Sequence, residues 1–228
     1  METVKDKTHE LKNEFILKAG MEISGLSTAS KGTLGAIVFK DGKPMILTNK
    51  HVITTDDPEQ TERNREKLLV RIKERDWDVA PELLKRIEEG EIPVFHPQYP
   101  RGDKRAKIVA FVSEAYDEYD AALCEIIIPL EQIDREINAD PIEPTEGRDV
   151  FKTGCKTGLS TGNIKQVERN ILIIEKIVSE YADSGAVFVE SGTNKPVGLL
   201  FKVDSDYTYA YKMTTLAAKM GFSFKKTH

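Results

Sequence analysis

Three residues of this chain, His51, Asp120 and Ser184, are of the types that together hydrolyse esters and amides. Each lies beside an apolar run typical of a β-strand. A serine hydroxyl is a weak nucleophile at neutral pH. It becomes reactive when an imidazole takes its proton and a carboxylate orients and stabilises that imidazole. The pattern therefore predicts covalent catalysis through an acyl-enzyme.

The segments around these residues resemble the motifs of the trypsin-like serine peptidases over roughly residues 20–220. The order His, Asp, Ser along the chain is also the order in that superfamily. The match is closest to prokaryotic members of an intracellular kind. The resemblance is carried by the histidine motif at 48–52, the aspartate motif at 119–123 and the serine motif at 182–185, with supporting segments at 158–162 and 198–201.

The resemblance implies that Ser184 attacks the carbonyl, His51 takes the serine proton and Asp120 holds the imidazole. The oxyanion would be bound by the backbone N–H groups of Ala182 and Ser184, a donor pair that contributes several kcal/mol to the barrier reduction. Relatives usually have glycine where this chain has Ala182. An alanine with positive φ costs roughly 1 kcal/mol, which favours a hole that is collapsed in the resting state.

Asp183 raises a related question about this loop. In relatives activated by cleavage, the matching aspartate pairs with a newly formed N-terminal amine. Nothing near residue 30 resembles an activation site. We therefore expect another partner for Asp183, or a loop that is ordered by the substrate or by an activating protein partner.

The substrate-binding residues expected from the resemblance are Val178, Phe201, Lys202 and Val203. Val178 falls where the family has the base of its primary pocket, which would make that pocket apolar. The alternative is that Val178 is simply a core residue. The segment 201–203 resembles the strand that pairs with the substrate backbone. The substrate's identity stays open.

The resemblance implies an all-β fold, with two six-stranded antiparallel β-barrels (chymotrypsin-like) in a single peptidase domain over 1–228. An N-terminal arm over 1–20 includes a short amphipathic helix at 7–18. The first barrel covers about 21–129 and contains a helical insertion at 57–105. The second barrel covers about 148–213, and a C-terminal helix covers 214–221. The insertion is interpreted either as solvated helices that cap the first barrel or as a regulatory docking element.

Composition narrows the possible partners. The 33 Lys and Arg against 38 Asp and Glu give a net charge of −5, and no long basic patch indicates nucleic-acid binding. No apolar run is long enough to span a membrane, and the N-terminus lacks the apolar core of a signal peptide. The two cysteines, Cys124 and Cys155, favour a reducing compartment, so a cytoplasmic location is expected. No cofactor and no metal is expected.

The leading hypothesis is a serine endopeptidase that acts on polypeptide substrates. The alternative is a catalytically weak or inactive protease fold that serves as a binding module, and a third hypothesis is an esterase with the same triad. A fluorophosphonate probe separates the two enzymes from the binding module, and peptide turnover then separates the two enzymes.

Overall fold

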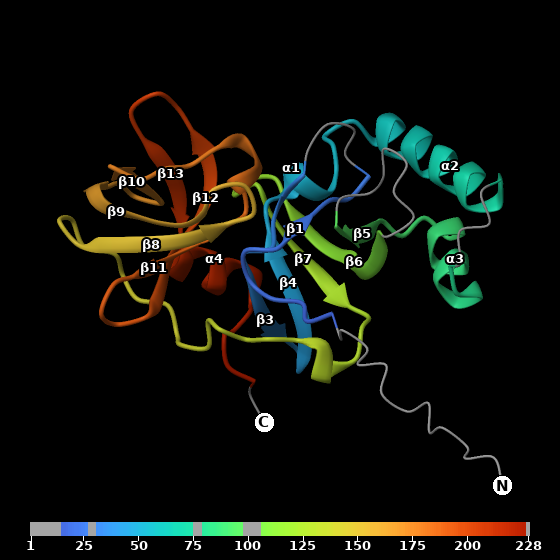
Figure 1. Cartoon of the computed structure of the whole chain (residues 1–228), viewed down its shortest axis with the longest axis horizontal. Coiled ribbons are helices and arrows are strands. Elements are labelled where there is room, and N and C mark those ends of the chain that lie inside the picture. The colour runs from blue at the N-terminus through green and yellow to red at the C-terminus, as the bar shows by residue number, and fades with distance from the viewer. Residues whose placement is uncertain (1–14, 27–30, 75–78, 98–105, 227–228) are drawn as a thin grey trace, which may run out of the picture.

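Two β units lie side by side, and a helical pair flanks the first of them (Figure 1). The computed structural model describes residues 15–26, 31–74, 79–97 and 106–226. The strands of the first unit are β1 (Glu22–Ile23), β2 (Gly32–Thr33), β3 (Ala36–Lys40), β4 (Lys43–Thr48), β5 (Pro93–His96), β6 (Lys107–Tyr116) and β7 (Ala121–Ile126). Those of the second are β8 (Asp149–Gly154), β9 (Gly158–Val167), β10 (Ile171–Glu175), β11 (Val187–Glu190), β12 (Lys195–Val203) and β13 (Thr208–Lys212). The helices are α1 (Lys50–Ile53), α2 (Pro58–Glu74), α3 (Pro81–Glu88), α4 (Met213–Met220) and the 3₁₀ turns η1 (Leu130–Gln132) and η2 (Tyr181–Asp183).

The second unit is a closed antiparallel barrel with the strand order β10-β13-β12-β11-β8-β9. Alternation along each strand sends every second side chain inward. Leu172, Ile174, Leu200 and Ala210 meet in this way in a fully buried core. The six-stranded barrel expected for the second half of the chain is therefore present.

The first unit differs from the expected first barrel. It is an open five-stranded sheet, β3-β4-β7-β6-β5, accompanied by a two-stranded sheet of β1 and β2. Ser24 makes an isolated bridge to Phe95 of β5. The prediction of six strands in a closed barrel was wrong here, because β1 and β2 pair over only two residues each and cannot form a continuous ladder along the edge of β5.

The helices of the insertion, α2 and α3, cover β5 and β6. Leu68, Ile72 and Ile87 are buried in one cluster with Phe95 and Phe111. The apolar stripe expected from the sequence therefore packs internally, as the capping interpretation requires. The expected boundary of 57–105 was too wide, because 93–96 is strand β5 in the main sheet. The stretch 98–105 lies outside the described residues.

The predicted N-terminal helix is not confirmed in the described residues, whereas the predicted C-terminal helix is present. Residues 7–14 of the predicted N-terminal helix lie outside the described residues, and 15–18 are not helical. Leu17 instead forms an isolated bridge with Ile133, which lies between η1 and β8. The C-terminal helix is present as α4, one residue earlier than predicted. It ends at Gly221, whose φ of 67° is left-handed.

One hydrophobic core joins the two units. Leu47 and Leu123 of the first unit meet Val187 and Leu199 of the second, and Leu216 of α4 is buried with them. Apolar burial of this kind stabilises the contact by about 25 cal/mol per Å². The loops that follow β4 and η2 and the loop that precedes β7 are therefore held at fixed positions along this junction.

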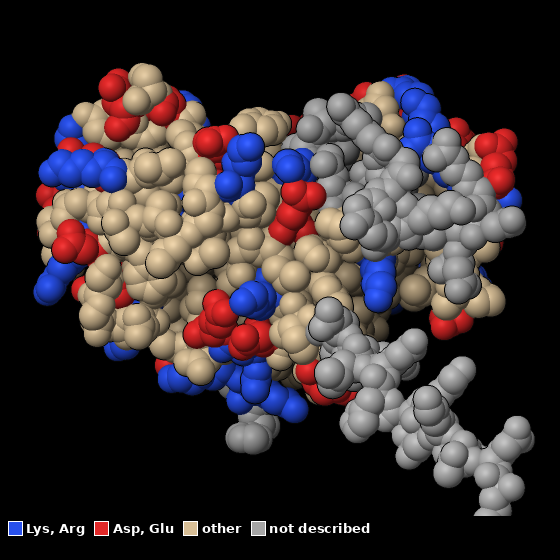
Figure 2. Space-filling model, viewed as in Figure 1, with Lys and Arg blue, Asp and Glu red and all other residues tan. Residues whose placement is uncertain are grey.

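Two further observations concern the whole molecule. Among the described residues, no helix is both long and apolar enough to span a bilayer. On the face shown in Figure 2, basic and acidic side chains are interspersed, and the surface over the second barrel is largely uncharged.

Candidate active site

His51 is positioned by a short helix that follows directly on a buried strand. The strand β4 ends at Thr48, and α1 begins at Lys50. Val52 and Ile53 are fully buried and anchor the helix in the first unit, whereas 36% of the His51 side chain is exposed. The imidazole is thus held on a rigid element and still reaches solvent.

Asp120 binds His51 with both carboxylate oxygens. His51 Nδ1 lies 2.5 Å from Asp120 Oδ2, and the His51 backbone N–H donates to Asp120 Oδ1 at 2.9 Å. A carboxylate accepts, so the Nδ1 atom carries the proton and Nε2 is the nitrogen able to take up a further proton. The structure brings together these two sequence-predicted residues in the geometry that a general base requires.

Ser184 follows η2 and is pressed against the first unit. Its carbonyl accepts a hydrogen bond from the Thr33 N–H at 2.8 Å. Gly185 has a φ of 94°, and a Cβ there would lie 2.4 Å from Thr33 O and 2.5 Å from Thr48 Oγ1. Only glycine fits this close approach. The serine loop is therefore fixed beside the strands that deliver His51.

The oxyanion loop adopts a conformation that does not form the expected hole. Ser184 Oγ donates to the Tyr181 carbonyl at 3.2 Å. Because C=O and N–H point in opposite directions across a trans peptide, the Ala182 N–H is turned away from Ser184 Oγ. Ala182 lies in the 3₁₀ turn η2 and is not among the residues with positive φ. The alanine thus avoids the strain expected for an open hole.

The Ala182 carbonyl is also held in place. Thr33 Oγ1 donates to it at 3.0 Å, and Cys155 Sγ lies 3.0 Å from it. The Thr33 hydroxyl in turn accepts from the Cys155 N–H at 3.0 Å. Burial raises the pKa of the Cys155 thiol, so the neutral S–H donor is favoured.

Asp183 finds its partner inside the second barrel. Lys152 Nζ lies 2.9 Å from Asp183 Oδ2, and neither side chain is exposed. Thr157 Oγ1 also donates to Oδ2, and the backbone N–H groups of Lys156 and Thr157 donate to Oδ1. Lys152 is therefore the other partner that the sequence led us to expect for Asp183.

Burial disfavours the charged forms of Lys152 and Asp183, whereas their hydrogen bonds and mutual attraction favour these forms. Burial by itself raises the pKa of Asp183, but the hydrogen bonds from Thr157, Lys152 and the Glu180 N–H lower it overall. Burial lowers the pKa of Lys152, and Asp183 counteracts that shift. Sequence reasoning missed Lys152. The available signal was a lysine at an inward position of β8, between Val150 and Gly154.

The predicted substrate-binding residues lie on two segments, one between β10 and η2 and one at the end of β12. Val178 is 65% exposed, which excludes its alternative assignment to the core. Phe201 stacks on Tyr211 with ring centroids 4.1 Å apart. Lys202 and Val203 pair with β13. Among the described residues, the pairing of β12 with β11 ends at Leu199, so Phe201 to Val203 lie beyond it.

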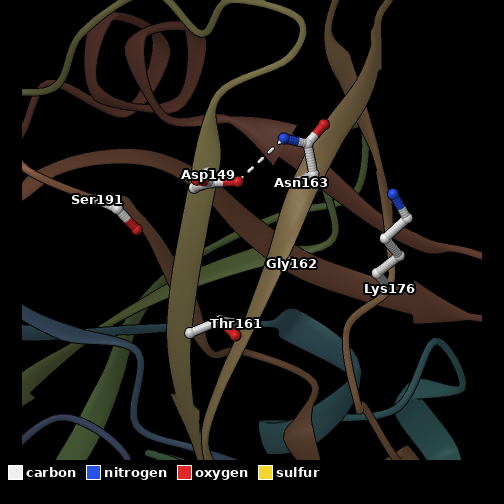
Figure 3. A pocket seen from close by; sticks show the side chains of 6 residues that line it. All are labelled: Asp149, Thr161, Gly162, Asn163, Lys176 and Ser191. Carbon is white, nitrogen blue, oxygen red and sulfur yellow. Dashed lines mark hydrogen bonds between the residues drawn. The ribbon is translucent and has the colours of Figure 1, made fainter.

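A separate polar hollow lies on the second barrel. It has a volume of about 490 Å³ and is lined by residues including Asp149, Thr161, Asn163 and Lys176. Figure 3 shows Asn163 between Lys176 and Asp149, to which it donates at 3.1 Å. Lys176 pairs with Glu175 at 3.4 Å. None of the sequence-predicted site residues lines this hollow.

No protein-family model matches the chain, and no curated protein does. Solved structures do match. Protease A of Thermobifida fusca is 11% identical with a TM-score of 0.59, over 93% of this chain and 100% of its own. A Cellulomonas bogoriensis chymotrypsin is 11% identical with a TM-score of 0.58, over 93% of this chain and 100% of its own. An inactive form of Rv3671c from M. tuberculosis is 14% identical with a TM-score of 0.54, over 88% of this chain and 84% of its own. The chain has the fold of the chymotrypsin-like serine proteases, shared with bacterial enzymes at low sequence identity.

Proposed function

We propose that this protein is a serine endopeptidase whose resting state is latent. The observation that carries the proposal is the pairing of His51 with both carboxylate oxygens of Asp120, beside a serine loop that is fixed to the same β unit. The protease fold supports polypeptide as the substrate class. Latency is supported by the Tyr181 carbonyl, which accepts from Ser184 Oγ on the side where the oxyanion donors are expected.

Catalysis begins with a rotation of the Tyr181–Ala182 peptide. The rotation withdraws the Tyr181 carbonyl from Ser184 Oγ and turns the Ala182 N–H toward the reacting carbonyl, where it joins the Ser184 N–H. Ser184 Oγ then attacks, and its proton passes to His51 Nε2. Asp120 stabilises the imidazolium, which returns the proton to the leaving amine. Water activated by His51 releases the acyl group.

The substrate supplies the energy for this rotation. A polypeptide strand that pairs with the free side of Phe201 to Val203 gains backbone hydrogen bonds and passes beside the exposed Tyr181, whose relative exposure is 68%. The rotation breaks one neutral hydrogen bond, worth about 0.5–1.5 kcal/mol. It also places Ala182 at positive φ, at a cost of roughly 1 kcal/mol. These costs are within reach of substrate binding or of an activating protein partner.

A fluorophosphonate probe tests the nucleophile. Intact mass spectrometry should detect one adduct on the wild type, no adduct on Ser184→Ala, and an unchanged adduct on the exposed-loop control Ser205→Ala. An unfolded polypeptide substrate should be cleaved by the wild type and by the control only. Labelling that persists in Ser184→Ala would place the nucleophile elsewhere.

The second candidate function is an inactive binding module, and the closed oxyanion loop is the observation in its favour. This function predicts no labelling and no cleavage, even with an excess of unfolded polypeptide present, together with stable retention of that polypeptide. Peptide turnover, as opposed to ester turnover alone, separates the peptidase from an esterase.

The free thiols of Cys124 and Cys155 support the proposed reducing, cytoplasmic location.

A further inference from the structure

We propose that Asn49 is a positioning residue for the His51–Asp120 pair. The inference rests on the proposed function and goes beyond the three triad residues. Asn49 lies between β4 and α1 and is fully buried. Its Nδ2 donates to the backbone carbonyl of Asp120 at 2.8 Å. No described residue donates to its Oδ1, so the bond from Nδ2 to Asp120 is the side-chain hydrogen bond that the described residues give Asn49.

The bond matters because of the backbone conformation of Asp120. Asp120 has a φ of 41°, in the left-handed region. Holding a residue other than glycine there costs of order 1–3 kcal/mol, and the surroundings must supply this energy. The Asp120 carbonyl accepts two hydrogen bonds, from Asn49 Nδ2 and from the Lys50 N–H at 3.0 Å. Together they fix the orientation of the peptide that follows Asp120, and with it the direction of the carboxylate.

Asn49 also adjoins the two other segments of the site. It is two residues before His51 in the chain. Its backbone N lies 3.4 Å from the position that a Cβ on Gly185 would occupy, next to Ser184. Asn49 is therefore buried where three segments meet: the one with the base His51, the one with the orienting carboxylate of Asp120 and the one with the nucleophile Ser184.

The charged groups near Asn49 do not replace its hydrogen bond in fixing the Asp120 carbonyl. Lys50 Nζ forms ion pairs with Asp56 and Asp117, whose side chains are 94% and 85% exposed. Exposed pairs of this kind typically contribute about 0–1 kcal/mol and are screened by salt. The Lys50 backbone donor remains in any Asn49 variant, but it is only one of the two donors on the Asp120 carbonyl.

The main test variant removes the amide of Asn49 and keeps the side-chain volume nearly unchanged. Asn49→Leu removes the donor with little change in side-chain size, and Asn49→Asp places an acceptor against the Asp120 carbonyl. Asn64→Leu is the matched control, because Asn64 Nδ2 likewise donates to a backbone carbonyl, that of Leu26, at 2.6 Å on α2. Asn49→Ser, which keeps a shorter donor, serves as the conservative variant and as the second variant if Asn49→Leu does not fold.

The first readout needs no turnover. The His51 Nδ1 proton should give a far-downfield proton resonance, assigned by its loss in His51→Ala. We expect this resonance in the wild type and in Asn64→Leu. In Asn49→Leu and Asn49→Asp, at temperatures where all are folded, it should move upfield or broaden. Asn49→Ser should recover it in part. An unchanged resonance in folded Asn49→Leu would overturn the proposal, and so would its absence from the wild type.

The second readout separates positioning from folding. A misdirected carboxylate should lower kcat by about 10- to 100-fold, because small displacements of catalytic groups have effects of this size. KM should stay within about twofold, because the Asn49 side chain is fully buried and cannot contact a bound substrate. A variant that loses thermal stability but keeps kcat would show that Asn49 is only structural. If the wild type has no peptidase activity, the proposed function fails, while the resonance still decides the role of Asn49.

Discussion

Substituting Ala182 by glycine should activate this protein. The closed loop has the Tyr181 carbonyl on Ser184 Oγ and Ala182 in a 3₁₀ turn. Opening the hole rotates the Tyr181–Ala182 peptide, which changes the φ of Ala182 to a positive value. A positive φ costs an alanine roughly 1–2 kcal/mol and costs glycine almost nothing.

The size of the effect follows from this difference. The hydrogen bond from Ser184 to Tyr181 is lost on opening in both proteins, so it cancels. Removing about 1 kcal/mol from the cost of opening raises the population of the open loop about fivefold while that population is small. Glycine also weakens the 3₁₀ turn of the closed state, which acts in the same direction. A five- to thirtyfold gain is therefore expected for a difference of about 1–2 kcal/mol.

The assay is the rate of fluorophosphonate labelling, followed by intact mass, together with kcat/KM on a fluorogenic peptide. Ala217→Gly on α4 is the control, because it makes the same chemical change away from the loop and should alter stability without a gain in rate. Equal or slower labelling of folded Ala182→Gly would refute the reasoning. It would mean that the φ of Ala182 does not change in the activating step.

Two further predictions concern stability. Lys152→Met leaves Asp183 as an uncompensated buried charge, so urea denaturation should show a free energy of unfolding lower by about 3–5 kcal/mol. The control Lys43→Met, in an exposed pair, should lower it by less than about 1 kcal/mol. Since the pKa of Asp183 is lowered on folding, its contribution is present above the unfolded value of about 4 and is lost as pH falls through the lower folded pKa. The destabilisation caused by Lys152→Met should therefore be full at neutral pH and shrink as pH falls below about 4, because protonation neutralises the buried Asp183 carboxylate; a destabilisation that does not change with pH would contradict the pairing. Leu68→Ala on α2 should cost about 2–5 kcal/mol and Val70→Ala, at a half-exposed site, about 0.5 kcal/mol or less; equal costs would mean that the insertion does not pack on the sheet.

The sequence by itself determined the features that depend on local pattern. The order and surroundings of His51, Asp120 and Ser184 predicted the fold. The strand periodicity predicted strands in the second half of the chain, the family resemblance implied their closure into a barrel, and the proline and glycine positions predicted the helices after His51. These signals are local because alternation and capping act over a few residues. The doubt about Ala182 came from its residue type together with the resemblance, because relatives usually have glycine there.

The tertiary structure decided what depends on contacts between distant segments. Lys152 and Asp183 are 31 residues apart, so their pairing inside the barrel had no local signature. The first unit is an open sheet because β1 and β2 are too short to close it. The side of the peptide that faces Ser184 and the bond from Asn49 to Asp120 also arise only after folding. The physical reason is that hydrogen-bond partners and buried charges are chosen by the packing of the whole chain, whereas the sequence pattern fixes only which face of each element is apolar.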